Sequence, residues 1–357
     1  MCCIFIFYAA ILKAQKKVAG TNGEALTAYT SSGLFDNDEI LHFKLTGKLN
    51  SLFNDRGDNS SYHPMLLQYK NKDSNDVAIQ LLVKTRGHFR LLRENCKMPP
   101  LLLGFSKAQK LKNSPFEKQN KLKLVVPCQG DEYVIREWLV YKLYNLITEK
   151  SFKAKLVQVD FEDSLMKRKI ETHYCILLED DKKVADRSDA FVWKHKMLPM
   201  KNTNADEFKK MAVFRYMIGN TDWSVPYLQN IILITKDSTK PAFAIPYDFD
   251  HAGIVDAPYA GAAPELEISS IRVRLYRGFC ENDKDNFAET FELYNRLKND
   301  IYDLYTNCSL LNPRYIKYVT NYFDEFYKTI NSDKLVEREF QKPCRTNVRV
   351  ELKGLKD

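Results

Sequence analysis

The chain has 357 residues, of which 45% are hydrophobic and 28% are charged. This composition is that of a globular protein with a sizeable core, and the length suits two compact units or one domain of two lobes. The formal net charge of +8 is spread along the chain, with local clusters at residues 167–169 and 194–196. It favours an acidic or phosphorylated ligand only weakly, and we expect no nucleic-acid partner.

The chain begins with an apolar run from Cys2 to Leu12 that ends at Lys13-Ala14-Gln15. The run has the length of the apolar core of a signal peptide and is too short to span a bilayer. We therefore predict that residues 1–14 are a cleaved export signal, although no basic residue precedes the run; a buried strand or helix is the alternative. The expected location is periplasmic or extracellular. No later run predicts a stable membrane span, and we expect a monomer.

Removing Cys2 and Cys3 with this signal leaves six of the eight cysteines, an even number that is compatible with disulfides in an exported chain. None belongs to a CxxC pair, and the six histidines lack HxH or HxxxH spacing, so no Cys/His metal site is expected. Cys96 and Cys128 each flank one of two neighbouring apolar strands. We predict that they form a disulfide; two buried free thiols are the alternative.

Residues 15–38 are polar and are predicted to form a flexible leader. Residues 39–179 are predicted to form a β-rich small lobe with one main helix, over residues 132–147, where apolar positions repeat with a helical period. The strands expected in this lobe cover residues 40–45, 65–69, 77–84, 101–105, 121–126, 155–161 and 172–178.

The pattern becomes mainly helical after Glu179, so residues 180–335 are predicted to form a helical large lobe and residues 336–357 a peripheral tail. The fold class is therefore α+β. Two short strands, over residues 231–234 and 242–247, are expected to pair as a hairpin. The helices expected here cover residues 205–218, 287–305 and 313–330.

Three polar residues lie at the ends of these elements. Asp222 follows a polar turn after the first helix, Asn230 opens the first strand of the hairpin, and Asp248 ends the second. Phosphoryl transfer needs a carboxylate to orient the acceptor hydroxyl, and an Asn and an Asp to hold the magnesium that bridges the phosphates. The hairpin therefore predicts a phosphotransfer site. The alternative is that these residues only form turns beside core strands.

Candidate nucleotide-binding residues lie in the small lobe. Kinases place a Lys on a small-lobe strand and pair it with a helix Glu at the α and β phosphates, which points to Lys123 and Glu137. No GxGxxG loop exists, and the nearest substitute is the basic turn with Arg86 and Gly87, where a glycine lets the backbone approach phosphate. The alternatives are a solvent-facing strand Lys, a surface helix Glu and an ordinary hairpin turn.

The segments Gly219-Asn220-Thr221-Asp222 and Tyr247-Asp248 resemble the catalytic and metal-binding segments of HipA-type kinases. Asp248-Phe249-Asp250 resembles the spore-coat CotH kinase family, as does the Arg86-Gly87 turn. The resemblance implies a two-lobed protein-kinase-like fold in which Asp222 is the catalytic Asp. It also implies that Asn230 and Asp248 bind metal, with Asp250 as a second acidic neighbour.

One departure concerns the interval from Asp222 to Asn230, which is eight residues (230 − 222) where kinase catalytic loops have five. Gln229 is therefore a rival metal ligand.

The function implied by the resemblance is that of an exported atypical kinase. It would transfer the γ-phosphate of ATP, with Mg²⁺ or Mn²⁺, to a hydroxyl of a protein or glycan acceptor. The long catalytic loop and the missing Gly-rich loop leave a pseudokinase, a binding module of the cell envelope, as an alternative. An enzyme that attaches AMP to a hydroxyl and an unrelated structural domain are further alternatives.

Overall fold

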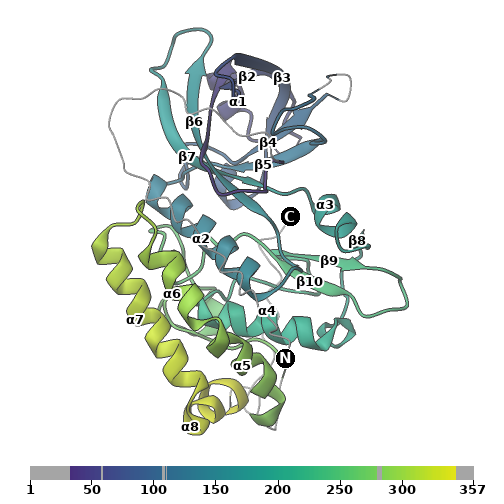
Figure 1. Cartoon of the computed structure of the whole chain (residues 1–357), viewed down its shortest axis with the longest axis vertical. Helices are drawn as coiled ribbons and strands as arrows, with labels where there is room; N and C mark the ends of the chain where they lie inside the picture. The colour runs from purple at the N-terminus through teal and green to yellow at the C-terminus, as the bar shows by residue number, and fades with distance from the viewer. Residues whose placement is uncertain (1–32, 58, 107–108, 110, 280–283, 343–357) are drawn as a thin grey trace, which may run out of the picture.

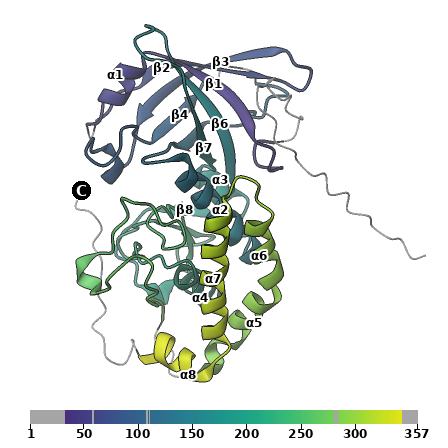
Figure 2. The same ribbon diagram turned by 90° about the vertical axis from the view of Figure 1, so that its left-hand side faces the viewer.

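The computed structural model describes residues 33–342 except residues 58, 107–108, 110 and 280–283. The predicted signal peptide, residues 15–32 of the predicted leader and residues 343–357 of the predicted tail lie outside the described residues. The described chain is a mixed α+β structure in which a β-barrel lobe stands on a mainly helical lobe (Figures 1 and 2).

Seven strands of the described chain close into a barrel in the order β1-β2-β3-β4-β5-β7-β6. Neighbouring strands are antiparallel except β1 and β6, which run parallel and close the barrel. Alternate side chains of each strand fill the interior, as Leu41, Phe43 and Leu45 do in β1. The strands are β1 (Leu41–Gly47), β2 (His63–Lys70), β3 (Asp76–Thr85), β4 (Leu101–Phe105), β5 (Lys121–Val125), β6 (Ala154–Asp163) and β7 (Glu171–Leu178).

All seven strands expected in the small lobe are present, with ends that differ from the predicted ones by at most two residues. The expectation of a sheet with one main helix needs correction. The sheet closes on itself, which leaves no unpaired edge, and a short helix α1 (Leu49–Asn54) and a 3₁₀ turn η1 (Phe89–Leu91) accompany it. Alternation along a strand shows which face is buried, but it does not show whether the first and last strands pair.

Helix α2 (Asp131–Ile147) lies between the two lobes and packs against β6, β7 and α6 (Figure 1). Its side chains are buried around most of its circumference because it has the barrel on one side and helices on another. This enclosure includes a charged residue, Glu137, which is only 2% exposed.

The large lobe contains the predicted hairpin, since β9 (Ile231–Thr235) pairs antiparallel with β10 (Phe243–Pro246). The three-residue strand β8 (Phe191–Trp193) extends it to a three-stranded sheet. The other elements are α3 (Asp181–Asp186), η2 (Met200–Asn202), α4 (Ala205–Met217), η3 (Pro264–Leu266), η4 (Lys284–Phe287), α5 (Ala288–Arg296), α6 (Lys298–Thr306), α7 (Pro313–Ile330), α8 (Asp333–Val336) and the π-helical η5 (Glu337–Gln341).

The single helix predicted over residues 287–305 is wrong, because the structure divides it into α5 and α6 at Leu297. The apolar positions keep their three- and four-residue spacing through the junction, so the pattern contains no sign of the break. In the described part of the chain, no helix is both long enough and apolar enough to cross a bilayer.

The last residues of the predicted leader pack on the barrel. Leu34 is 1% exposed and belongs to the barrel core. The Lys155 ammonium donates to the backbone oxygen and to Oδ1 of Asn37, at 2.9 and 2.6 Å. The predicted boundary at residue 38 is therefore too late, because residues 33–38 already belong to the folded structure.

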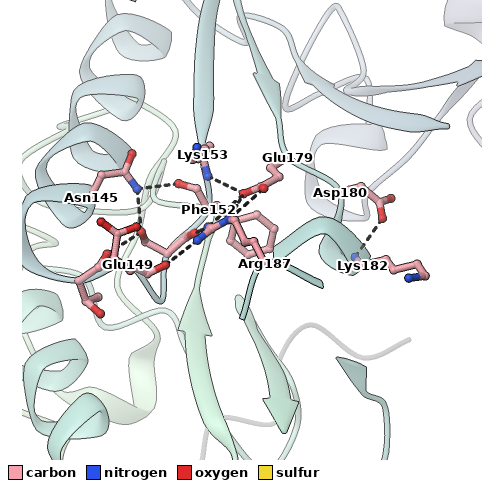
Figure 3. Close-up of polar contacts among 10 residues, drawn as sticks. Asn145, Glu149, Phe152, Lys153, Glu179, Asp180, Lys182 and Arg187 are labelled. Atoms are coloured by element: carbon pink, nitrogen blue, oxygen red, sulfur yellow. Dashed lines mark hydrogen bonds and ion pairs between the residues drawn. The ribbon is translucent and has the colours of Figure 1, made fainter. Parts of the chain in front are cut away.

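The connection between the lobes runs through Glu179 and Asp180, where β7 ends and α3 begins (Figure 3). The buried Glu179 carboxylate accepts hydrogen bonds from Arg187 Nε at 3.1 Å and from the Lys153 backbone N–H at 3.0 Å. Asp180 caps α3 by accepting from the Lys182 N–H at 2.9 Å. These contacts hold the two lobes in a defined relation.

Candidate active site

Two glycines join the segments that carry the candidate site. Gly219, after α4, has a φ of 65°, and a Cβ there would lie 2.1 Å from Tyr322 Oη. A Cβ at Gly253 would lie 2.5 Å from the Ile271 carbonyl oxygen. The Gly253 N–H donates to Gly219 O at 3.0 Å, so the chain before Asp222 and the chain after Asp250 lie side by side. A side chain at either position would meet Tyr322 or Ile271, so both positions favour glycine.

The Asp222 carboxylate is held by two side-chain amides. Asn230 Nδ2 donates to Asp222 Oδ2 at 2.8 Å, and Gln229 Nε2 donates to Asp222 Oδ1. Ser224 and Gln229 exchange two backbone hydrogen bonds of 3.0 Å, so the extra residues of the long loop form a small turn. This turn returns Asn230 to Asp222 despite the eight-residue interval.

Burial raises the pKa of Asp222 above its ordinary value, and the nearby His251 and Arg215 offset part of this rise. The group therefore holds a proton more readily than an exposed Asp does. A carboxylate with a raised pKa is better suited to accept a proton near neutral pH.

Arg215, in α4, connects the loop after α4 to the ends of both hairpin strands. It is 1% exposed, and it donates to Asn220 Oδ1 and to the Asn230 carbonyl oxygen, each at 2.6 Å. A longer contact of 3.4 Å reaches the Tyr247 carbonyl oxygen. Sequence reasoning assigned Arg215 no role in the site, although a charged residue within the apolar stripe of a helix was an available signal.

The Asp248-Phe249-Asp250 segment lies against α2. The Asp248 N–H donates to Tyr141 Oη at 2.9 Å, and the Phe249 N–H donates to Glu137 Oε1 at 3.4 Å. The Phe249 ring is buried 4.7 Å from the Tyr141 ring. Helix α2 thus sets the position of the segment, and Glu137 lies in its immediate surroundings.

Carboxyl groups of like charge are crowded here. Burial, followed by repulsion from Asp250, raises the pKa of Asp248 to about 6. Burial and the charges of Asp250 and Asp248 raise the pKa of Glu137 well above its ordinary value, and the buried Arg90 opposes this. Taking several carboxylates out of water next to one another disfavours their charged forms. Additional positive charge next to the cluster would favour the charged forms of these carboxyl groups.

Lys123 and Arg86 bring positive charge from the barrel lobe. Lys123 Nζ pairs with Asp181 Oδ1 at 2.8 Å and lies 4.7 Å from the centre of the Tyr247 ring. The expected pair between Lys123 and Glu137 is not formed, because Glu137 points to the Phe249 backbone. Arg86 is near enough to lower the pKa of Asp248.

The basic turn after β3 packs over the site. Gly87 has a φ of 94°, which favours glycine, and, its chain neighbours aside, no described residue lies within 4 Å of the place a Cβ would take. Phe89 contacts the His251 ring, with 5.4 Å between ring centres. The predicted disulfide between Cys96 and Cys128 is confirmed, and it joins the chain after this turn to the chain before α2.

The described residues contain no group of three or more His, Cys, Asp or Glu side chains arranged to hold a metal ion. Asp248 and Asn230 nevertheless carry the oxygen ligands that a divalent cation takes. They lie at the ends of paired strands, where the Tyr247 N–H donates to Asn230 O at 3.1 Å. Neither the Asp248 carboxylate nor Asn230 Oδ1 accepts a hydrogen bond from a described residue. Carboxylate and amide oxygens suit Mg²⁺ or Mn²⁺, which take further ligands from phosphates and water.

No family model and no curated protein matches the chain. Among solved structures, the chain is similar to the Helicobacter pylori proinflammatory kinase CtkA, with 14% sequence identity and a TM-score of 0.39, over 69% of this chain and 90% of that chain. It is also similar to the golgi casein kinase, with 10% identity and a TM-score of 0.35, over 86% of this chain and 77% of that chain. Likenesses of this degree do not assign the chain to a family.

Proposed function

We propose that the chain is an atypical kinase that transfers the γ-phosphate of ATP to a hydroxyl group of a protein or glycan acceptor. The observation that supports the proposal is that Asp222, Asn230 and Asp248 belong to segments joined by hydrogen bonds. Asp222 follows a helix, and Asn230 and Asp248 lie at the ends of two strands. Asn230 donates to the Asp222 carboxylate, and Tyr247, next to Asp248, donates to the Asn230 carbonyl oxygen. Two basic residues of the other lobe, Arg86 and Lys123, lie near Asp248. Arg86 opposes the rise that burial causes in the pKa of Asp248. Burial lowers the pKa of Lys123, and the charge of Asp248 in turn opposes this fall.

Asp222 is the group that receives the proton of the acceptor hydroxyl. Its two amide contacts orient the carboxylate, and a carboxylate has lone pairs left after accepting two hydrogen bonds. As the acceptor oxygen bonds to the γ-phosphorus, its O–H bond breaks toward Asp222 and the bond to the β-phosphate oxygen breaks, which releases ADP.

Asn230 and Asp248 would hold the magnesium, with Asp250 as an acidic neighbour. When bound, the metal supplies positive charge that neutralises the phosphates. Lys123 and Arg86 contribute further positive charge on the barrel side, and the open space at Gly87 leaves room for a phosphate beside the backbone. Glu137 positions the Phe249 backbone rather than pairing with the lysine.

The decisive experiment compares Asp222→Ala with the unchanged protein in ATP binding, in stability and in transfer to a generic acceptor such as myelin basic protein or to the chain itself. We expect transfer to fall by about 10²- to 10⁴-fold, because proton transfer to a positioned group contributes this much, while ATP affinity stays within about threefold. Asp237→Ala is a matched control, because Asp237 is an exposed turn residue that accepts from the Thr239 N–H at 2.9 Å.

Mass spectrometry of the product separates the related activities. Addition of one phosphate supports the kinase, and addition of AMP replaces it with nucleotide transfer on the same site. Magnesium-dependent ATP binding without any product identifies a pseudokinase. Full transfer by Asp222→Ala would show that Asp222 is a turn residue and would end the proposed mechanism.

We also propose that the protein works outside the cytoplasm. The Cys96–Cys128 disulfide supports this, because disulfides persist in oxidising compartments. Intact-mass analysis after thiol alkylation of protein from an exporting host tests it: retention of Met1 and alkylation of both cysteines would contradict export.

A further inference from the structure

The loop that joins β6 to β7 exposes apolar and basic side chains together. This loop, residues 164–170, is called the hairpin tip below. Three of its apolar side chains are largely exposed: Leu165 is 48%, Met166 93% and Ile170 55% exposed. Exposed apolar side chains on a soluble protein are usually scattered singly, so three within seven residues mark an interaction surface.

The same loop carries three positive charges and no acidic residue. Lys167 and Lys169 are exposed, and Arg168 lies between them, paired with Glu171 at 2.9 Å. The nearest acidic side chain on the β6 side is Asp163, which is buried and accepts hydrogen bonds from the Leu49 and Lys167 N–H groups at 3.0 and 3.1 Å. The lysine charges of the tip are therefore not neutralised by their own loop.

The backbone of the hairpin tip forms a hydrogen-bonded turn. The Met166 N–H donates to the Asp163 carbonyl oxygen at 2.8 Å, and Met166 has a φ of 53°. The strands on either side pair up to Phe161 and Glu171. The exposure of Met166 is thus imposed by a hydrogen-bonded backbone, which holds the side chain away from the barrel.

Figures 1 and 2 both show this loop at the end of the barrel farthest from the helical lobe. A projecting tip can reach a flat surface without obstruction by the rest of the molecule. Binding there leaves Asp222 and Asp248, which belong to the large lobe, on the side away from the surface.

We propose that the hairpin tip binds the surface of an anionic lipid bilayer, with Met166 and its apolar neighbours entering the interface and the lysines contacting lipid phosphates and carboxylates. Charge complementarity favours this occupant, because apolar side chains interleaved with basic ones match the boundary between acyl chains and anionic headgroups. Lysine stems also place their carbon atoms along apolar material while the ammonium stays in water. The inference does not depend on the proposed kinase activity.

Co-sedimentation of the purified chain with vesicles tests it. We expect binding to phosphatidylcholine vesicles that contain about 30% phosphatidylserine, and little binding to phosphatidylcholine alone. Lys167→Gln with Lys169→Gln should weaken the partition coefficient about 25-fold, or about fivefold for each charge, and Met166→Ser should weaken it about tenfold.

Matched controls lie elsewhere on the surface. Lys236→Gln with Lys240→Gln makes the same change in net charge on the exposed loop between β9 and β10. Leu82→Ser removes an exposed apolar side chain from the barrel wall, 51% exposed where Met166 is 93% exposed. These variants should bind as the unchanged protein does. A thermal melt of every variant verifies folding.

An interfacial probe adds a second measurement. Met166→Trp should shift its fluorescence to shorter wavelengths on anionic vesicles, whereas Leu82→Trp should not. The proposal would be overturned if the tip substitutions left vesicle binding unchanged, or if the control substitutions weakened it equally. It would also be overturned if the unchanged protein did not bind anionic vesicles, and an acidic protein would then be the partner to examine.

Discussion

Asp248 occupies a position at which its charge opposes folding. Its neighbours Asp250 and Glu137 are acidic and buried, and its pKa rises from an ordinary 3.8 to about 6. An acid whose pKa is raised in the folded state binds protons more readily there than in the unfolded chain. The ionisation of Asp248 therefore lowers the free energy of unfolding. This loss is absent below about pH 4 and complete above about pH 6. A buried acid that lowers the stability of the fold indicates a functional role rather than a role in forming a turn.

We therefore predict that Asp248→Asn increases the free energy of unfolding at pH 7, without metal, by about 1 to 2 kcal/mol. Asn adopts the left-handed backbone that the φ of 59° requires, so the turn should survive. The variant should also lose the decline in stability between pH 4 and pH 6. Urea unfolding at several pH values measures both effects.

Asp256→Asn is the matched control for this substitution. Asp256 has a φ of 56° but pairs with Arg272 at 2.7 Å, so its loss should give no gain in stability. If Asp248→Asn destabilised the protein as a lost turn residue does, the carboxylate cluster would not be the unfavourable arrangement described here.

Elements of both lobes meet at Lys123, where β5 of the barrel contacts Asp181 of α3. We predict that Lys123→Met lowers ATP affinity about tenfold or more, because a charge-assisted contact with phosphate contributes about 1.5 to 3 kcal/mol. Asp181→Asn should not lower the affinity, since it releases the lysine for phosphate. Isothermal titration calorimetry measures both.

Lys121 serves as the control for Lys123, because it lies on the same strand with an exposed side chain. Lys121→Met should leave ATP affinity unchanged. Equal losses for the two lysines would indicate a general effect of positive charge and would remove Lys123 from the site.

The disulfide is the covalent link between the basic turn and the chain that enters α2. Cys96 and Cys128 are 32 residues apart, and closing a loop of this length stabilises a fold by about 3 to 4 kcal/mol in the chain-entropy account. Cys96→Ser with Cys128→Ser should lower the free energy of unfolding by this amount. Urea unfolding with and without reductant measures it.

Cys308, a free and partly buried thiol, provides the comparison. Cys308→Ser should retain the response to reductant, whereas the double variant should lose it. A wild-type protein equally stable with and without reductant would contradict the expected contribution of the disulfide.

At the scale of the whole molecule, the barrel and the helical lobe supply opposite charges to one site, so a ligand that contacts both should stabilise the fold. ATP with magnesium at one hundred times its dissociation constant should add about 2.7 kcal/mol, or about 4 °C in melting temperature. Differential scanning fluorimetry measures this shift. We expect Asp248→Asn to lose the magnesium-dependent part. The absence of a shift with Mg²⁺ and with Mn²⁺ would oppose nucleotide binding altogether.

Sequence alone determined the features that depend on neighbours along the chain. Short apolar or alternating segments located all seven barrel strands, and the helical period located α2, α4 and α7. Two short strands close together in the chain were enough to predict the hairpin, because a hairpin joins adjacent segments. Asn230 and Asp248 were expected to lie close together because they stand at its ends. The Cys96–Cys128 pair followed from strands that are neighbours in the chain.

Tertiary structure decided the features whose partners are distant in the chain. Closure of the barrel pairs β1 with β6, and the break at Leu297 lies in a continuous apolar pattern. Lys123 pairs with Asp181 rather than Glu137, and Arg215 reaches both hairpin strands. A charged residue in a sequence has many potential partners, and only the packing of α2, α3 and α4 around the hairpin selects one, because burial requires each charge and backbone group to be satisfied locally.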